Sequence, residues 1–328
     1  MKIFVTGGAG FIGSHFVRRL LAAGGSEVTV LDKLTYAGNR ANLPKEDPQL
    51  RFVRGDINDG ALLAELLPGH DAVVHFAAES HVDRSLSGAS DFVLTNVLGS
   101  QVLFDACLKA RVERVVHVST DEVYGSVPEG SSLEGDPLLP NSPYAASKAG
   151  GDLLARSYFQ SHRLPVVITR CSNNYGPYQY PEKVIPLFIT NLLTGKQVPV
   201  YGDGRNVRHW LHVDDHCRAI ELALEKGTPG EIYNIAGGPE LSNLDLTMRI
   251  LELCGADERR IQYVTDRKGH DLRYSVDYSR ITEELGYQPQ KSFDEGLAEV
   301  IDWYRDNQWW WAPQTQPVDP AAGAEQAG

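Results

Sequence analysis

The sequence predicts an α/β protein: a doubly wound parallel sheet of the Rossmann type, followed by a smaller C-terminal α/β lobe. Two observations predict the sheet. Over residues 1–170, short runs rich in valine and isoleucine alternate with longer segments of helical periodicity, which is typical of parallel strands whose connecting helices cover both faces. A glycine-rich turn also joins the first of these strands to the first helix, as in the nucleotide-binding sheets of this class.

The individual elements follow from periodicity and composition. Each expected strand is a short, continuous apolar run, as buried parallel strands are: 2–7, 27–32, 51–56, 71–77, 114–120 and 165–170. Helices are expected between them at 11–24, 61–69, 91–112 and 142–162. The less regular region 171–311 predicts a lobe over the open edge of the sheet, with helices at 182–195, 213–227, 243–255 and 292–308 and strands at 198–202 and 231–236. The tail 312–328 has too few apolar residues to bury, so we expect it to be disordered.

The composition limits the possible classes of function. Of the 328 residues, 42% are hydrophobic, and 31 Lys plus Arg stand against 43 Asp plus Glu, a formal net charge of -12. This acidic balance argues against broad nucleic-acid binding, which needs a basic surface. A local arginine can still hold a small phosphate ligand. We therefore expect no nucleic-acid partner.

The cysteines and the N-terminus indicate a compartment. Cys107, Cys171, Cys217 and Cys254 are scattered without a C-x-x-C pair, which predicts neither a zinc site nor a disulfide framework and fits reduced thiols. The chain enters a strand at once, without an apolar signal segment, and no apolar run approaches the length of a membrane span. We expect a soluble, cytoplasmic protein without a membrane partner.

The glycine-rich turn predicts a dinucleotide site. Gly8, Gly10 and Gly13 match G-x-G-x-x-G directly after a strand and at the start of a helix, where backbone N–H groups can bind a pyrophosphate. Asp32 ends the second strand, 19 residues after Gly13, and is placed to bind a ribose 2′-hydroxyl. Because a carboxylate repels a 2′-phosphate, NAD is favoured over NADP, although the neighbouring Lys33 leaves NADP open. A purely structural glycine turn is the alternative.

Two more strand ends fit the same site. Asp56 and Ile57 end the third strand, where an adenine edge can be contacted, and Ala77 and Ala78 end the fourth and are small enough for close approach of a cofactor. Because ligands of doubly wound sheets bind at the carboxyl ends of the strands, we expect these residues to line the cofactor site.

Tyr144 and Lys148 predict acid–base chemistry. They are four residues apart in an expected helix and therefore share a face. A lysine ammonium, aided by a positively charged nicotinamide ring, stabilises a phenolate and lowers the tyrosine pKa, so that the tyrosine can act as a general base. The Y-x-x-x-K spacing is frequent by chance, but here it follows a glycine turn and the fifth strand.

Several of these residues resemble the motifs of a known protein family. TGGAGFIG, Asp32, Thr120, and Tyr144 with Lys148 resemble the extended short-chain dehydrogenases/reductases. The carboxylates Asp121 and Glu122, directly behind Thr120, narrow the resemblance to the dTDP-glucose 4,6-dehydratase family. Further matching segments are DKLTYAGN, AAESHVDRS, CSNNYGPYQYPEK, VYGDGRNVRHWLHVDDHCRAI and KGHDLRY, and the resemblance runs from Met1 to about Trp311.

The resemblance implies a reaction without net redox change. A 4,6-dehydratase oxidises C4 of the sugar, removes the C5 proton, expels the C6 hydroxyl as water and returns hydride to C6. The implied roles are a hydrogen bond to O4 for Thr120, C5 proton removal for Glu122 and proton donation to the leaving hydroxyl for Asp121, which requires a raised pKa. The residues alone leave open which of Asp121 and Glu122 is the acid and which is the base. The alternative to a catalytic role is that both are ordinary solvated acids of a loop. The implied catalytic set is Thr120, Asp121, Glu122, Tyr144 and Lys148.

The resemblance also implies the two binding sites. The implied NAD contacts are Gly7, Gly10, Phe11, Ile12, Gly13, Asp32, Lys33, Thr35, Gly38, Asp56, Ile57, Ala77, Ala78, Thr95, Tyr144, Lys148 and Cys171. The implied nucleotide-sugar contacts are Ser80, Thr120, Asn173, Glu182, Lys183, Pro199, Tyr201, Arg208, Asn243, His270 and Tyr274, with Asp83 near the sugar. Among them, Arg208 and His270 are expected at the pyrophosphate and the segment 199–201 at the thymine. Packing or surface roles are the alternative for each substrate contact.

Several alternatives stay open. A nucleotide-sugar 4-epimerase and a 4,6-dehydratase of a UDP- or GDP-sugar share most of these motifs, and a non-catalytic NAD-binding sensor is a remote third reading. The resemblance implies a homodimer that pairs the helices around 90–110 and 143–162 as a four-helix bundle.

Two further patterns are given structural interpretations. His212 and His216 lie four residues apart with Asp214 and Asp215 between them, which resembles a metal site, but we expect an aspartate to cap a helix start there. No metal is therefore predicted. The tryptophans at 309–311 are expected to pack the last helix.

Overall fold

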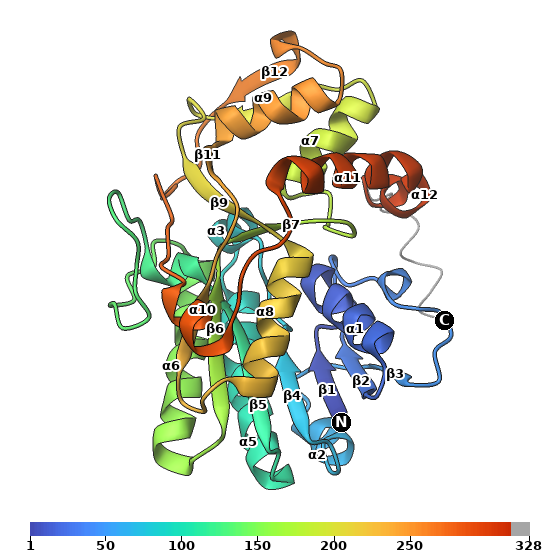
Figure 1. Cartoon of the computed structure of the whole chain (residues 1–328), viewed down its shortest axis with the longest axis vertical. Helices are drawn as coiled ribbons and strands as arrows, with labels where there is room; N and C mark the ends of the chain where they lie inside the picture. Colours follow the sequence, from blue (N-terminus) through green and yellow to red (C-terminus); the bar gives the residue numbers. More distant parts are fainter. Residues whose placement is uncertain (316–328) are drawn as a thin grey trace.

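The computed structural model describes residues 1–315, which form a larger lobe around a sheet and a smaller lobe beside it (Figure 1). The seven strands of the large sheet are all parallel and follow the order β10-β6-β5-β4-β1-β2-β3. The strand order reverses between β1 and β4, which creates a crevice at the carboxyl ends of the strands. The strands are β1 (Lys2–Thr6), β2 (Glu27–Asp32), β3 (Leu50–Arg54), β4 (Ala72–His75), β5 (Arg114–Thr120), β6 (Val166–Cys171) and β10 (Ile232–Ile235).

Helices cover both faces of this sheet, which confirms the predicted fold class. Alternate residues of β1 face opposite ways: Ile3 and Val5 pack with Phe16 of α1, whereas Phe4 packs with Phe104 of α5. Both faces of the strand are buried, which explains its unbroken apolar sequence. One face is covered by α1 (Phe11–Ala23) and α8 (Val213–Lys226), and the other by α2 (Gly60–Leu66), α5 (Ser100–Ala110) and α6 (Pro143–His162).

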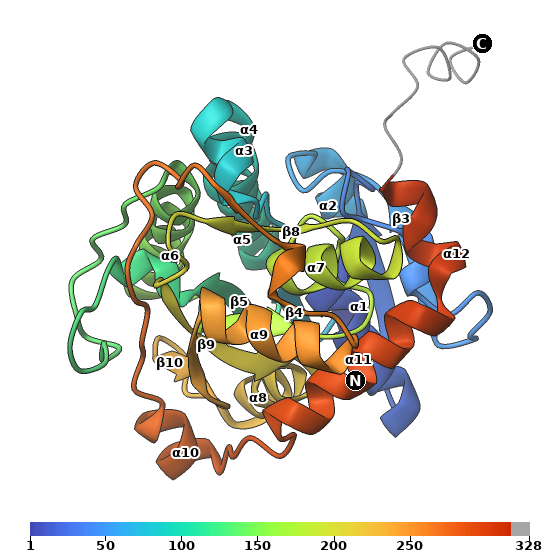
Figure 2. The ribbon, with the colours of Figure 1, turned by 90° about the horizontal axis from the view of Figure 1, so that it is seen from above.

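The smaller lobe has its own apolar core. It contains the three-stranded sheet β11-β9-β7 and the pair β12-β8, and Figure 2 looks down on this lobe, with α7, α9 and α11 in the foreground. Ile189, Leu246 and Leu297 pack together in its core. Its elements are β7 (Asn173–Tyr175), α7 (Val184–Leu193), β8 (Val198–Tyr201), β9 (Val207–His212), β11 (Glu240–Ser242), α9 (Asn243–Leu253), η4 (Glu258–Arg260), β12 (Ile261–Val264), α11 (Phe293–Asp306) and α12 (Gln308–Trp311).

The chain crosses between the lobes more than once after residue 170. The strand β10 pairs with β6 in the large sheet, and α8 packs on the same sheet, although both lie in the range 171–311 that we expected to form the second lobe. α10 (Ser279–Leu285) also packs against β10 and α8. Parts of the range 171–311, which we expected to form mainly the second lobe without a sharp boundary, thus return to the larger lobe, because strand pairing brings β10 back to the open edge of the sheet.

One helical stretch is more apolar than the sequence analysis allowed. Residues 90–110 form α4 (Ser90–Phe92), the π-helical η2 (Val93–Gly99) and α5 in succession, and this stretch is long and apolar enough to cross a membrane by length and composition alone. The statement that no apolar run approaches that length is thus wrong. In the fold, Leu103 and Phe104 of this stretch pack under the large sheet.

Four short elements complete the described chain. They are η1 (Arg40–Asn42), α3 (Val82–Ser87), η3 (Asp121–Tyr124) and η5 (Ala312–Gln314). The last of these occupies the start of the tail for which we expected disorder, and residues 316–328 of that tail lie outside the described residues.

Candidate active site

Two adjoining cavities lie at the carboxyl ends of the strands. The first has a volume of about 300 Å³ and is lined by the glycine turn and the ends of β2, β4 and β5. The second, of about 190 Å³, lies toward the smaller lobe. The two share lining residues and therefore form one cleft; the shared residues are Glu122, Asn173, Asn174, Gln179, Glu182 and Lys183.

The backbone of the glycine turn is packed too closely for side chains at Gly7 and Gly13. Gly7 has φ +69°, and a Cβ on it would lie 2.5 Å from the backbone nitrogen of Ala77. A Cβ on Gly13 would lie 2.3 Å from the carbonyl oxygen of Gly7. Helix α1 begins directly after Gly10 at the edge of the first cavity, so its free N–H groups suit a pyrophosphate.

The carboxylate of Asp32 is held firmly beneath this turn. Its two oxygens accept hydrogen bonds from the backbone N–H groups of Ala9 at 2.9 Å and Leu34 at 2.8 Å. Burial raises the pKa of Asp32, and these two hydrogen bonds partly oppose that effect. The neighbouring Lys33 is paired with Asp56 at 2.7 Å, so its charge is already compensated and gives little attraction for a 2′-phosphate. The site thus fits NAD.

The residues implied as cofactor contacts meet in one place. Every one of them lines the first cavity: Gly7, Gly10, Phe11, Ile12, Gly13, Asp32, Lys33, Thr35, Gly38, Asp56, Ile57, Ala77, Ala78, Thr95, Tyr144, Lys148 and Cys171. They come from the ends of β1 to β6 and from the helices that follow, which is how a doubly wound sheet assembles a ligand site.

Tyr144 and Lys148 share a face of α6 beside this cavity. Burial, followed by the carboxylate of Glu122, raises the pKa of Tyr144 well above its usual value. The ammonium of Lys148 donates to the carbonyl oxygen of Val118 at 2.7 Å, and burial lowers its pKa. The expected lowering depended on the nicotinamide ring as well as on Lys148 and stays a prediction for the NAD-bound enzyme, whereas in the chain by itself burial is the largest influence on the tyrosine pKa.

Asp121 and Glu122 are not solvated loop acids. Thr120 ends β5, and its hydroxyl donates to the Asp121 carboxylate at 3.3 Å, while the second oxygen of that carboxylate has no protein partner. Burial and then the like charge of Glu122 raise the pKa of Asp121 to about 8. Burial also raises the pKa of Glu122, which Arg208 and Lys183 oppose. Glu122 lines both cavities, whereas Asp121 lies behind the wall and lines neither.

The implied substrate contacts are divided between the two cavities. The first is lined by Ser80, Thr120, Asn173, Glu182 and Lys183, and the second by Asn173, Glu182, Lys183, Pro199, Tyr201, Arg208, Asn243, His270 and Tyr274, together with Asp83. The set therefore runs along the whole cleft, from the cofactor side to the smaller lobe.

Arg208 is a cation at the wall of the second cavity. Its guanidinium lies over the Tyr274 ring at 4.1 Å and donates to the carbonyl oxygen of Asp271 at 3.0 Å. No carboxylate forms an ion pair with it within residues 1–315. A fixed arginine without an acidic partner suits a phosphate.

Comparison with known proteins decides among these interpretations. Residues 4–300 match the family model described as GDP-mannose 4,6 dehydratase. A dTDP-glucose 4,6-dehydratase of an Actinoplanes species is 60% identical over 95% of this chain and 100% of that protein, and one of Streptomyces niveus is 56% identical over 100% of both. The structure of a dTDP-glucose 4,6-dehydratase from Streptomyces venezuelae, with NAD bound, superposes with a TM-score of 0.95 at 62% identity, covering 96% of this chain and 100% of that one.

The chain belongs to the dTDP-glucose 4,6-dehydratase family. This confirms the resemblance drawn from the sequence. The fold itself is shared more widely, since the UDP-glucose 4-epimerase of Thermotoga maritima superposes with a TM-score of 0.88 at 32% identity, covering 94% of this chain and 100% of that one. Because the two folds are so similar, the features that separate a dehydratase from such an epimerase must lie in the active site.

The dehydratase cleft also contains residues that the sequence analysis missed. Asn174 and Gln179 line both cavities, and Arg267 lines the second. Arg267 forms an ion pair with Asp83 at 2.6 Å and lies over the ring of Tyr201 at 5.4 Å. No local sequence pattern marks these positions. The only sign of them in the sequence was their place within or next to the segments that match the family.

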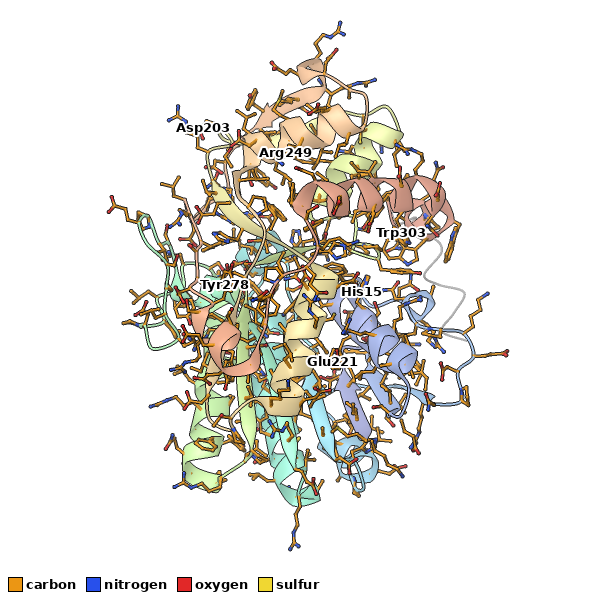
Figure 3. The ribbon with its side chains drawn as sticks, viewed as in Figure 1. His15, Asp203, Glu221, Arg249, Tyr278 and Trp303 are labelled. Carbon is orange, nitrogen blue, oxygen red and sulfur yellow. The ribbon has the colours of Figure 1, made fainter. Side chains whose placement is uncertain are left out.

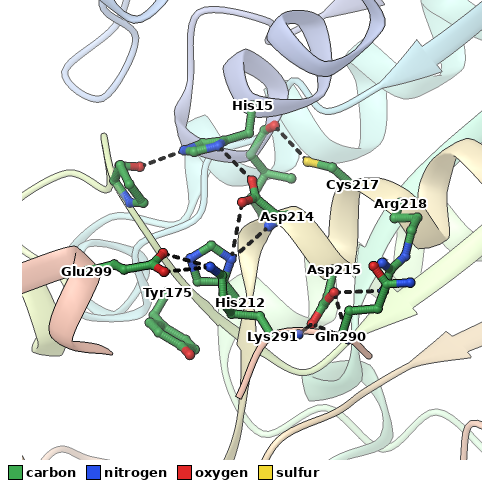
Figure 4. Close-up of polar contacts among 12 residues, drawn as sticks. His15, Tyr175, His212, Asp214, Asp215, Cys217, Arg218, Gln290, Lys291 and Glu299 are labelled. Atoms are coloured by element: carbon green, nitrogen blue, oxygen red, sulfur yellow. Dashed lines mark hydrogen bonds and ion pairs between the residues drawn. The ribbon is translucent and has the colours of Figure 1, made fainter. Parts of the chain in front are cut away.

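The histidines that resemble a metal site belong to the scaffold of this dehydratase: His216 shares a hydrogen bond with Asn174 at 2.9 Å, and Figure 4 shows the contacts of His212. The side chain of His212, not an aspartate, caps α8 by accepting the N–H of Asp214 at 3.3 Å. Asp215 instead accepts the backbone N–H groups of Gln290 and Lys291, each at 3.0 Å. Expecting an aspartate cap was therefore wrong, because both carboxylates have partners outside the helix end. Among residues 1–315 no group of three or more His, Cys, Asp or Glu could hold a metal ion.

The raised pKa of Asp121 predicts the pH dependence of the dehydratase. The role implied for Asp121 by the resemblance, that of proton donor, requires the protonated carboxyl, and Asp121 keeps its proton below its pKa of about 8. Turnover is expected to fall as pH rises through about 8, as measured by the rate of product formation. Asp121→Asn, which has no titrating group at this position, should show a slow rate without this loss. A wild-type rate that stays constant through this range would contradict the assignment.

Proposed function

We propose that the chain is a dTDP-glucose 4,6-dehydratase that converts dTDP-glucose to dTDP-4-keto-6-deoxy-glucose with NAD. The observation that carries the proposal is the adjacent acid pair at the cleft: Glu122 is half-buried and lines both cavities, and Asp121 is buried directly behind it. Relatives that are 56–60% identical over nearly the whole chain support the same activity.

The first step takes place at C4. Thr120 donates a hydrogen bond to O4, and Tyr144 removes the proton of the C4 hydroxyl, with the buried charge of Lys148 close to it on the same face of α6. When bound, NAD would supply the hydride acceptor for C4 and the hydride donor for C6, where C5 takes a proton back from Glu122, and its positively charged ring would favour the phenolate of Tyr144.

The elimination step uses the two carboxylates. The C4 ketone acidifies the C5 proton, so the carboxylate of Glu122, which lines both cavities, suffices as the base. Hydroxide is a poor leaving group, and Asp121, whose pKa is raised to about 8, holds the proton that the C6 oxygen needs. This division of roles requires the Asp121 carboxyl to reach the cavity wall when the sugar binds.

The nucleotide is proposed to lie in the second cavity. Arg208 and His270 bind the pyrophosphate, and the segment 199–201 packs against the thymine. Burial lowers the pKa of His270, although its partner Asp266 at 2.7 Å opposes this effect. Arg208, whose guanidinium offers a fixed fork of donors, therefore supplies the main attraction for the phosphates.

Two other activities use similar chemistry. A 4-epimerase needs no acid–base pair for water loss, so Asp121 and Glu122 weigh against it. A 4,6-dehydratase of a UDP- or GDP-sugar would use the same pair and differ only at the base. A non-catalytic NAD sensor would need none of Thr120, Tyr144 and Lys148.

A panel of dTDP-glucose, UDP-glucose and GDP-mannose tests the assignment. With each sugar nucleotide at equal concentration, we expect dTDP-glucose to give by far the highest kcat/KM for a 4-keto-6-deoxy product. A preference for either of the other nucleotides would refute the proposed base specificity. Formation of a C4 epimer from any of them would refute the dehydratase reaction.

We also propose that the protein is a homodimer and works in the cytoplasm. Apolar side chains are exposed on the helical stretch 90–110 and on α6: Val93 is 52% exposed, Leu94 49%, Leu98 45% and Leu153 57%. These two helical segments pack side by side, so their outer faces form one apolar surface, which suits a second copy in a four-helix bundle. The four cysteines are free thiols, which fits a reducing compartment.

Charge placed on this surface should separate the copies. Leu94→Asp with Leu153→Asp is expected to change the dimer into a monomer, because two buried carboxylates per copy cannot be compensated there. Light scattering coupled to gel filtration measures the mass. Leu139→Asp, at a loop position that is 66% exposed, is the matched control and should stay dimeric. A wild-type chain that runs as a monomer would refute the proposal.

A further inference from the structure

The three consecutive tryptophans at the end of the described chain have different environments. Trp309 is 62% exposed, whereas Trp310 and Trp311 are each 3% exposed. The indole of Trp311 donates to the carbonyl oxygen of Tyr304 at 2.7 Å, within the same C-terminal segment. The indole of Trp310 instead donates across the molecule to Oδ1 of Asn42 at 2.7 Å. Trp310 thus connects the smaller lobe to the cofactor-binding lobe.

Asn42 also forms a hydrogen bond to the glycine turn. Its side-chain amide is fully buried and donates through Nδ2 to the carbonyl oxygen of Ala9 at 2.9 Å. Ala9 in turn donates its N–H to Asp32 at 2.9 Å. An indole can only donate, so Trp310 requires the amide oxygen of Asn42 on its side and the NH₂ group toward Ala9. A chain of three hydrogen bonds therefore joins Trp310 to the carboxylate that lies under the cofactor cavity.

A second arm of the same segment holds the loop between β7 and α7. The hydroxyl of Tyr304 donates to the carbonyl oxygen of Gln179, a residue that lines both cavities. Tyr178, which has φ +61°, packs against Trp303 at 4.6 Å and Trp310 at 5.6 Å between ring centroids. A non-glycine residue in this conformation needs support from its surroundings. Figure 3 shows Trp303 on α11 at the junction of the two lobes.

We propose that the segment 303–311 is a clasp that retains NAD, with Trp310 as its positioning residue. The clasp holds two walls of the cofactor cavity at once: the glycine turn, through Asn42, and the loop that carries Gln179. Release of NAD requires these walls to separate, and the clasp opposes this because it is fastened to both. Trp310 acts through Asn42 and does not touch the reacting atoms.

Exchange of bound NAD for a fluorescent etheno-NAD tests the proposal. In the purified holoenzyme, Trp310→Phe keeps the aromatic ring but removes the donor to Asn42, and NAD is expected to exchange about tenfold faster, the effect of one buried hydrogen bond. Trp311→Phe is the matched control, since it loses an equally short and equally buried indole bond that stays within the clasp. It should exchange within about twofold of the wild-type rate, as should Trp309→Phe. Equal exchange from the Trp310 and Trp311 variants would overturn the proposal.

A variant of Asn42 tests whether Trp310 acts on the glycine turn through this residue. Asn42→Ala is expected to exchange NAD as fast as Trp310→Phe, and the double variant no faster than either, because all three break the same connection. Additive effects, or an Asn42→Ala variant with the wild-type rate, would overturn the proposal. Where neither variant folds, hydrogen exchange of the wild-type chain decides. Exchange is then compared between the NAD-free and NAD-bound forms: bound NAD must slow exchange of the Trp310 indole proton by reciprocity, and equal rates in the two forms would overturn the clasp. None of these measurements depends on which sugar the enzyme uses.

Discussion

A chain that carries both Asp121→Asn and Glu122→Gln is expected to lose at least about 10³-fold in the rate of water elimination, since each carboxylate contributes to proton transfer. Both substitutions keep the size of the side chain and leave Arg208 and the cavity walls in place. The amides cannot remove the C5 proton or supply one to the C6 oxygen. Binding of dTDP-glucose, measured by calorimetry, should remain, whereas product formation should not.

The chain offers a matched control for this pair. Asp294 and Glu295 form the same dipeptide in the first turn of α11, where both are exposed. Asp294→Asn with Glu295→Gln removes the same charges from the protein and should leave turnover within about twofold of the wild-type value. Full turnover by the Asp121 and Glu122 double variant would refute the assigned roles.

Tyr144→Phe is expected to lower kcat by on the order of 10²- to 10⁴-fold, because it removes the group that takes the proton from the C4 hydroxyl. The ring remains to fill its buried site next to Phe92, so binding of the sugar nucleotide should change little. Steady-state kinetics with dTDP-glucose measure both effects.

Tyr158→Phe is the control for this substitution. Tyr158 lies on the same helix, and its hydroxyl donates to Asp105 at 2.6 Å on the side of α6 that faces α5. Loss of that hydroxyl should leave kcat close to the wild-type value. If Tyr144→Phe and Tyr158→Phe lowered kcat by the same factor, the loss would result from altered packing of α6 and not from the loss of a general base.

Local patterns made much of the fold and site predictable. The glycine turn, Asp32, and Tyr144 with Lys148 each depend on neighbours within one strand–turn–helix unit, so their spacing alone indicates their geometry. The alternation of strands and helices determined the parallel sheet for the same reason.

The features that were missed or wrong depend on distant partners. β10 joins the sheet next to β6, more than 60 residues earlier in the chain. The raised pKa of Tyr144 results from burial and from Glu122, neither of which its own helix reveals. Trp310 and Asn42 are separated by 268 residues, and no periodicity connects them. The local units of the site could therefore be predicted from the sequence, whereas the contacts between the lobes could not.

Conversion of dTDP-glucose in deuterated water tests the central claim, that this cleft eliminates water between C5 and C6. The base Glu122 exchanges its proton with solvent, so the product should be a 4-keto-6-deoxy sugar nucleotide with one deuterium at C5, as measured by NMR. Unchanged dTDP-glucose, or a C4 epimer without solvent deuterium, would contradict the account.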